Sequence, residues 1–132
     1  MVRFALAIAL VLAAHACSES TATNQPGALA RFEVEVSGEK FVVAVATQAQ
    51  AEAMRARLQS GTRGVVIGTL AAGHGGFNAP WAWHLTTQSA TTADLAIELC
   101  DGRPSMVSAD LAYWLGSVRQ FCPWGARVTR EL

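Results

Sequence analysis

The stretch of residues 32–46, FEVEVSGEKFVVAVA, decides the fold of this chain. Over residues 32–36 apolar side chains alternate with glutamates, and this period of two predicts a strand with one buried face. The sequence Ser37-Gly38-Glu39 indicates a tight turn. Residues 41–46 are continuously apolar and rich in valine, which is typical of a strand covered on both faces. We therefore predict a hairpin of two antiparallel strands.

A helix is predicted directly after the hairpin. The Thr47 side chain is placed to accept a hydrogen bond from the backbone N–H of Gln50, and Gln50 occupies the reciprocal position of a capping box. Gly61 supplies the left-handed residue with which such helices commonly end. At helical spacing, the side chains expected on the buried face are Ala51, Met54 and Leu58.

Apolar patterns in the rest of the chain predict further strands. They are expected at residues 64–70, 81–86, 94–100 and 126–131. Glycines and a proline mark residues 71–80 as a loop. We expect the strands 81–86 and 94–100 to pair antiparallel about a centre near Ala90. In the second of these strands, the side chains on one face are Leu95, Ile97 and Leu99.

A second helix is expected to begin near Pro104 and to run to about Leu115, since proline is tolerated in the first turn of a helix. Gly116 would end it. Its expected buried stripe consists of Met106, Val107, Leu111 and Trp114. Together these patterns predict one α+β domain over residues 31–132, with a mostly antiparallel sheet of four to five strands and two helices.

Composition excludes two broad classes of protein. Apolar residues make up 52% of the chain and charged residues 15%, so the chain can bury enough surface to fold and is not disordered throughout. The 10 basic and 10 acidic residues cancel. The chain therefore lacks the surplus of positive charge that is typical of nucleic-acid-binding proteins.

The first sixteen residues are predicted to be a signal peptide. Arg3 gives a short positive start, and residues 4–14 form an uninterrupted apolar run. This run is shorter than the about 20 residues that a membrane-spanning helix needs. Ala14-His15-Ala16 then offers small residues at the positions that a signal peptidase reads. We therefore expect an exported protein, located in the cell envelope or secreted.

Cys17 follows the predicted cleavage site directly. The segment Ala14-His15-Ala16-Cys17 resembles a bacterial lipobox, in which the cysteine is acylated and becomes the mature N-terminus. Residues 17–30 would then form a polar tether, and the lipid would be the only contact with the membrane. The alternative is ordinary cleavage after Ala16, which leaves a soluble secreted protein with a free thiol.

The cysteine count predicts one disulfide. The chain has 3 cysteines, and acylation of Cys17 would leave Cys100 and Cys122 as a pair. In an oxidising compartment these two can form a disulfide. Zinc is the competing use of cysteines, but neither residue belongs to a C-x-x-C motif or has a histidine near it in the sequence.

His84 and Glu98 are the candidate residues for catalysis. A carboxylate beside a histidine orients the ring and stabilises its protonated form, so such a pair can act as a general base. The expected strand pairing sets Glu98 diagonal to His84, at about 7–8 Å. The alternative is a structural His84, in a polar surface pair or buried with its nitrogens satisfied by backbone groups. Neither G-x-S-x-G nor S-x-x-K is present to supply a nucleophile, and a small hydrolase is the second of two functional hypotheses.

A binding surface is the first hypothesis. Trp81 and Trp83 are expected to fill the core, whereas Trp124, in a loop beside a cysteine and a proline, favours an exposed position. With His74 and Phe77 of the glycine-rich loop, Trp124 forms the predicted contact surface. Metal-binding and nucleotide-binding motifs are absent, so no metal and no cofactor is expected. The sequence thus predicts a non-catalytic binding module for a protein or a saccharide, with an extracellular protease as one candidate partner.

Short motifs carry a resemblance to a known family. They are Trp81-x-Trp83-His84-Leu85, Ile97-Glu98-x-Cys100-Asp101, Pro104-Ser105 and Cys122-Pro123-Trp124. Together they resemble a family of small exported domains found in bacteria and at the N-terminus of some social-amoeba and fungal proteins. The resemblance covers about residues 41–132 and implies paired cysteines at Cys100 and Cys122, but no established activity, cofactor or catalytic residue. The chain departs from the family at Tyr113-Trp114-Leu115 and in a shorter segment before Cys122.

Overall fold

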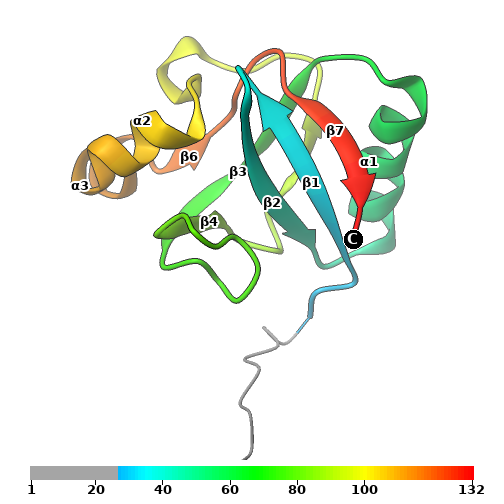
Figure 1. Ribbon diagram of the computed structural model, residues 1–132, viewed down its shortest axis with the longest axis horizontal. Coiled ribbons are helices and arrows are strands. Elements are labelled where there is room, and N and C mark those ends of the chain that lie inside the picture. Colours follow the sequence, from blue (N-terminus) through cyan, green and yellow to red (C-terminus); the bar gives the residue numbers. More distant parts are fainter. Residues whose placement is uncertain (1–26) are drawn as a thin grey trace, which may run out of the picture.

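The computed structural model describes residues 27–132, and Figure 1 draws the preceding residues only as a grey trace. The predicted signal peptide, the predicted lipid attachment at Cys17 and most of the predicted tether lie outside the described residues. Within residues 27–132, helices are interspersed with strands that pair antiparallel. The predicted α+β class is therefore confirmed.

The first two strands form the predicted hairpin. β1 (Ala30–Val36) pairs antiparallel with β2 (Glu39–Val45). Ser37 and Gly38 make the turn with positive φ angles of 52° and 81°. β7 (Arg127–Glu131) also pairs with β1, which gives a three-stranded sheet of order β2-β1-β7 (Figure 1).

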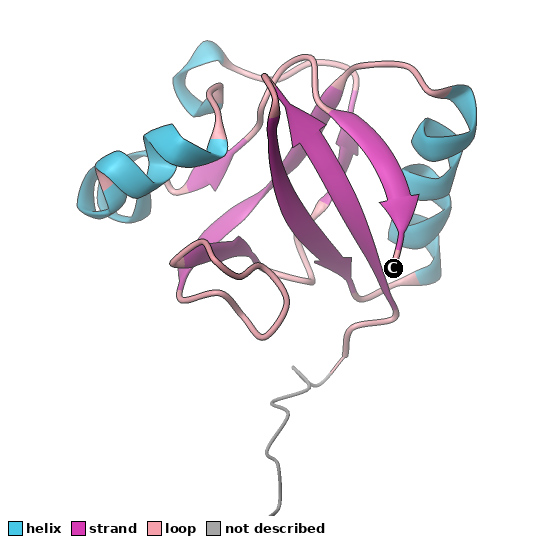
Figure 2. Cartoon of the chain, viewed as in Figure 1, coloured by secondary structure: helices cyan, strands magenta, loops and turns pink. Residues whose placement is uncertain are grey.

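The helix α1 (Gln48–Ser60) follows the hairpin as predicted. The hydroxyl of Thr47 accepts a hydrogen bond from the N–H of Gln50 at 3.3 Å, and the Gln50 side-chain oxygen accepts one from the N–H of Thr47 at 2.9 Å. Gly61 ends the helix in the left-handed conformation, with φ 65°. The helix lies beside β7 and β5, which it contacts (Figure 2). Its core-facing side chains are those predicted, Ala51, Met54 and Leu58.

β3 (Val65–Ala72) organises the second sheet. It pairs antiparallel with three shorter strands, β4 (Trp83–Leu85), β5 (Thr91–Ala93) and β6 (Gln120–Phe121). A bridge between Gly64 and Ala126 links the start of β3 to the chain that enters β7. The described strands thus form two sheets, of three and four strands, where the sequence predicted one sheet of four to five.

The predicted strand at residues 94–100 is wrong. β4 and β5 pair with β3 and not with each other, and residues 94–97 belong to no helix or strand. Glu98–Cys100 forms a 3₁₀ turn, η1. The physical reason is the disulfide between Cys100 and Cys122, which is present as predicted. It holds their Cα atoms 5.1 Å apart and so draws this part of the chain toward the end of β6.

The predicted second helix is divided into three pieces. α2 (Pro104–Ala109) ends at Asp110, whose φ of −140° is not helical. The side chain of Asp110 accepts a hydrogen bond from the N–H of Tyr113 at 3.3 Å and so starts α3 (Leu111–Tyr113). A π-helical turn, η2 (Trp114–Val118), completes the region. An aspartate that can cap a new helix therefore interrupts a continuous apolar pattern.

The end and the buried face of this region also differ from the prediction. Gly116 lies inside η2, and the helical region ends at Arg119, which is left-handed with φ 65°. Val107 and Trp114 are buried as predicted, whereas Met106 is 46% exposed. The break at residue 110 changes the register of the helix, so the stripe expected for one straight helix is not formed.

The core is built around aromatic rings from both sheets. Phe41 of β2, Trp83 of β4 and Phe121 of β6 are buried, with ring centroids 5.2–5.8 Å apart. Trp114 packs edge-on against Phe121 at 5.9 Å. Trp81 is half-buried, with its ring 6.2 Å from that of Trp83. The prediction that Trp83 fills the core is confirmed.

Candidate functional site

His84 is a buried residue of β4 with a structural environment. It is 6% exposed, and its Nδ1 lies 2.7 Å from the carbonyl oxygen of Gly73. Phe77 packs edge-on against the imidazole at 5.5 Å between ring centroids. Gly75 passes so close that a Cβ there would lie 2.7 Å from His84 Cγ. The ring thus supports the glycine-rich loop that crosses it.

Glu98 does not face His84. It is an exposed residue of η1, and the strand pairing that would have set it diagonal to His84 does not exist. Among residues 27–132, no carboxylate oxygen lies within 4.0 Å of a His84 ring nitrogen. The geometry of a histidine–carboxylate base is therefore absent at this place.

His74 and Phe77 lie together in the loop between β3 and β4. His74 is exposed, and its Nδ1 accepts a hydrogen bond from the N–H of Gly76 at 3.0 Å. Phe77 is half-buried, with the guanidinium of Arg31 6.0 Å from its ring centroid. Of the two, only His74 presents its side chain fully to solvent.

The same loop covers the outer edge of β2. Asn78 is fully buried: its Oδ1 accepts a hydrogen bond from the N–H of Val42 at 2.7 Å, and its Nδ2 donates to the carbonyl of Trp83 at 2.8 Å. The indole N–H of Trp81 donates to the carbonyl of Lys40 at 2.8 Å. Side chains thus satisfy backbone groups that an edge strand would otherwise expose.

Trp124 lies far from this loop. It is 42% exposed and lines a hollow with Ser37, just past the end of β1, whereas Phe77 contacts Arg31 near the start of β1. At about 3.3 Å per residue, β1 separates the two places by roughly 20 Å. Figure 1 shows the loop before β4 at the bottom of the molecule and the connection between β6 and β7 at the top. The structure therefore does not bring Trp124 together with His74.

Three exposed aliphatic side chains occupy the segment that leads to the disulfide. Leu95 is 88% exposed, Ile97 64% and Leu99 57%. Leu95 lines the same hollow as Trp124, and the carbonyl oxygen of Ile97 lies 3.4 Å from the sulfur of Cys122. We call Leu95, Ile97, Leu99 and Trp124 the apolar patch. The sequence analysis missed it because their alternation also fits a half-buried strand, although the Cys100–Cys122 pairing already placed residues 95–99 near Trp124.

Two hollows share Trp124 as a wall. The first has a volume of about 160 Å³ and is lined mainly by apolar residues, among them Val65, Leu95 and Ala96. The second has a volume of about 250 Å³ and combines the charges of Asp101 and Arg103 with apolar side chains. An apolar surface thus adjoins a polar one at Trp124.

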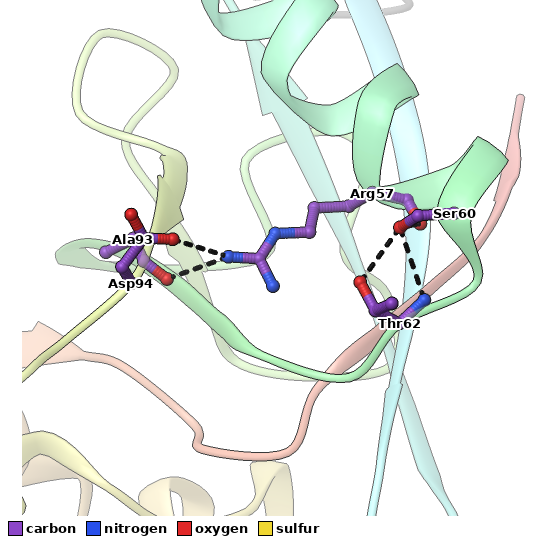
Figure 3. Close-up of polar contacts among 5 residues, drawn as sticks. All are labelled: Arg57, Ser60, Thr62, Ala93 and Asp94. Atoms are coloured by element: carbon purple, nitrogen blue, oxygen red, sulfur yellow. Dashed lines mark hydrogen bonds and ion pairs between the residues drawn. The ribbon is translucent and has the colours of Figure 1, made fainter.

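The segment that carries Leu95 and Ile97 is held at both ends. At its start the Nη2 of Arg57, from α1, donates to the carbonyl of Ala93 at 3.1 Å and lies 3.2 Å from the Oδ1 of Asp94 (Figure 3). At its end lies the disulfide of Cys100, which is buried. These contacts fix where the aliphatic side chains are presented.

Asp101 connects this segment to the backbone of Trp124. Its Oδ1 accepts hydrogen bonds from the N–H of Gly102 at 2.8 Å and from the N–H of Trp124 at 2.7 Å. A carboxylate that accepts two backbone N–H groups forms strong, charge-assisted hydrogen bonds. Asp101 therefore positions the indole relative to the residues that precede the disulfide.

Glu39 fixes the helix beside the second hollow. Its carboxylate accepts hydrogen bonds from the hydroxyl of Ser105 at 2.6 Å and from the Ser105 N–H at 2.7 Å. The hydroxyl bond, helped by the N–H bond and by the charge of Arg103 3.7 Å away, outweighs partial burial and lowers the pKa of Glu39 below its ordinary value of 4.5. Glu39 is therefore a structural anion that holds the start of α2 against the hairpin.

The described part of the chain contains no group of three or more His, Cys, Asp or Glu side chains arranged to hold a metal ion. No helix within residues 27–132 is both long and apolar enough to cross a membrane. The expectation that the protein uses no metal and no cofactor stays a prediction.

Comparison with known proteins identifies a family. No curated protein and no solved structure matches this chain. The family described as the BP-74 N-terminal domain matches residues 27–132, which are all the residues that the structure describes. The expected membership in a family of small domains is confirmed at this level. The chain belongs to the BP-74 N-terminal domain family.

Proposed function

We propose that this protein is an exported, non-catalytic binding module that contacts a partner protein through the apolar patch. The observation that carries the proposal is the exposure of Leu95, Ile97, Leu99 and Trp124, at 42–88% each. Clustered exposed apolar side chains are characteristic of interaction sites, because exposing them to water is unfavourable until a partner covers them.

The patch has the composition of the centre of an interface. Burying an exposed leucine or isoleucine contributes about 1.5–3 kcal/mol. Tryptophan is among the residues that most often dominate binding energy at interfaces. The fixed ends of the segment, at Arg57 and Cys100, reduce the conformational entropy that binding would cost. These features favour the patch over His74 and Phe77 as the main contact.

The sizes of the two hollows favour a macromolecular partner. Sites for small molecules and cofactors commonly enclose about 300–1,000 Å³. The hollows beside Trp124 measure about 160 and 250 Å³, so each suits a single side chain of a larger partner. A protein is therefore the partner that we propose, ahead of the saccharide considered from the sequence.

The hydrolase hypothesis has lost its structural basis. It depended on Glu98 lying beside His84, and these residues occupy different elements with no contact between their side chains. His84 instead contacts the loop that crosses it. We therefore propose no catalytic role for either residue.

Export is part of the proposal. A disulfide in a small domain is consistent with an extracellular location. We propose that residues 1–16 are a signal peptide, that Cys17 is acylated and that the remaining tether reaches from the membrane to β1. Mass spectrometry of the mature N-terminus tests this: an unmodified cysteine, or a chain that keeps its first sixteen residues, would contradict it.

Site-specific photo-crosslinking in the native envelope tests the binding function. A crosslinking amino acid at Leu95 or Trp124 is expected to capture one discrete protein, whereas the same group at Gln59, an exposed residue of α1, captures none. A crosslinker at His74 tests whether the glycine-rich loop forms a second contact. The proposal fails if Leu95 and Trp124 give no more product than Gln59.

A further inference from the structure

The chain between β5 and η1 has the features of an unpaired strand. Residues 94–97 follow β5 directly, and Ile97 has extended backbone angles of φ −74° and ψ 148°. Within residues 27–132, no acceptor is found for the N–H groups of Leu95, Ala96 or Ile97. Leu95 and Ile97 are exposed, so a partner can approach this backbone from solvent.

We propose that the partner protein adds an extended strand to residues 94–98 and places one of its apolar side chains in the hollow beside Trp124. This proposal rests on the binding function proposed above and names the form of the partner. In strand addition, backbone hydrogen bonds supply affinity and alternate side chains supply specificity. The period-two pattern of residues 94–99, which predicts a paired strand from sequence, then finds its pairing in the complex.

Charge indicates which strand fits this edge. Residues 93–102 include the acidic residues Asp94, Glu98 and Asp101 and no basic residue. Arg57 pairs with Asp94, and Asp101 accepts two backbone N–H groups, but Glu98 is exposed and forms no ion pair within the described residues. Opposite charges across a strand pair are stabilising and like charges are destabilising. The partner strand is therefore one in which basic residues alternate with apolar ones.

A second copy of this chain is a poorer occupant of the same edge. Antiparallel pairing of two such segments about Ile97 would match leucine with leucine, but it would also bring two copies of Glu98 to diagonal positions on one face. Neither copy supplies a basic residue between 93 and 102 to offset this repulsion. Self-association is therefore an alternative outcome of the test and not the proposal.

The test uses the full chain, exported with its own leader, and a blocked seven-residue peptide in which valine and lysine alternate. Two further peptides carry N-methyl groups on all valines or on all lysines, which removes the N–H donors from one edge of the peptide at a time. The parent peptide is expected to bind and to slow hydrogen exchange of the amides at residues 95–98. One methylated peptide should bind as the parent does, and the other should lose at least about tenfold in affinity.

Charge variants separate strand addition from nonspecific attraction. Glu98→Lys is expected to weaken binding of the parent peptide roughly fivefold, whereas Glu52→Lys, at an exposed site on α1, leaves it unchanged. Three results overturn the proposal: no binding of the parent peptide, equal binding of both methylated peptides, or equal weakening by both variants. A dimer that persists in the presence of the peptide overturns it in favour of a second copy. A crosslink at Leu95 together with a failed peptide leaves the binding function standing and removes only strand addition.

Discussion

Removal of the disulfide should destabilise the protein by an amount that the structure allows us to calculate. The bond joins residues 22 positions apart, and both sulfurs are buried in the native fold. In the chain-entropy model, opening a loop of this length costs about 3 kcal/mol at 25 °C. The double variant Cys100→Ala/Cys122→Ala should therefore lose about that much unfolding free energy, and the segment that carries Leu95 should lose its fixed position.

Urea unfolding followed by tryptophan fluorescence measures the loss. With a denaturant slope of about 1–3 kcal/mol/M, typical of small proteins, the midpoint should fall by about 1–3 M. Reductant supplies the control, because it should lower the midpoint of the native chain and leave that of Cys100→Ala/Cys122→Ala unchanged. A midpoint shift below about 0.5 M would refute the reasoning, since the disulfide would then not determine how this region is held.

Three further predictions concern the contacts that support the fold. Asn78→Ala removes both buried hydrogen bonds of that side chain and should cost about 1–3 kcal/mol in urea unfolding; a loss below about 0.5 kcal/mol would contradict its role at the edge of β2. Gly75→Ala places a Cβ 2.7 Å from His84 Cγ, so it should lower the melting temperature more than Gly73→Ala, which has a similar positive φ but nothing within 4 Å; equal losses would contradict this packing. Since the folded-state pKa of Glu39 lies below its ordinary value of 4.5, its contribution to stability is complete above that pH and is lost as pH falls through the folded value. The advantage of the native chain over Glu39→Gln should therefore shrink in unfolding experiments below pH 4.5, and an advantage that is constant with pH would count against it.

The local parts of the fold could be predicted from sequence because their signals act over a few residues. The hairpin depends on the alternation at residues 32–36 and on a two-residue turn, and the start of α1 depends on the contact between Thr47 and Gln50. Such features form in the same way whatever surrounds them. The burial of Trp83 was also predictable, because a large apolar side chain on an alternating strand has few other places to go.

The site could be predicted only in part, because long-range constraints decide it. The pattern around Ile97 fits a paired strand, but the bond between Cys100 and Cys122 draws the chain away from β3, and no described strand is left to pair with it. Trp124 was identified from its loop context, yet its neighbour Leu95 was not. Asp110 likewise looks like a surface residue of one long helix until its side chain is seen to cap a new one.

Hydrogen exchange of the amides of Leu95, Ala96 and Ile97 in the free, full chain tests the central claim most directly. The structure predicts little protection at these three amides, because they have no acceptor within residues 27–132, and strong protection at Leu85 in the core. Protection at residues 95–97 as strong as that at Leu85 would contradict the account, since it would mean that this segment is already paired within the chain and has no edge to offer a partner.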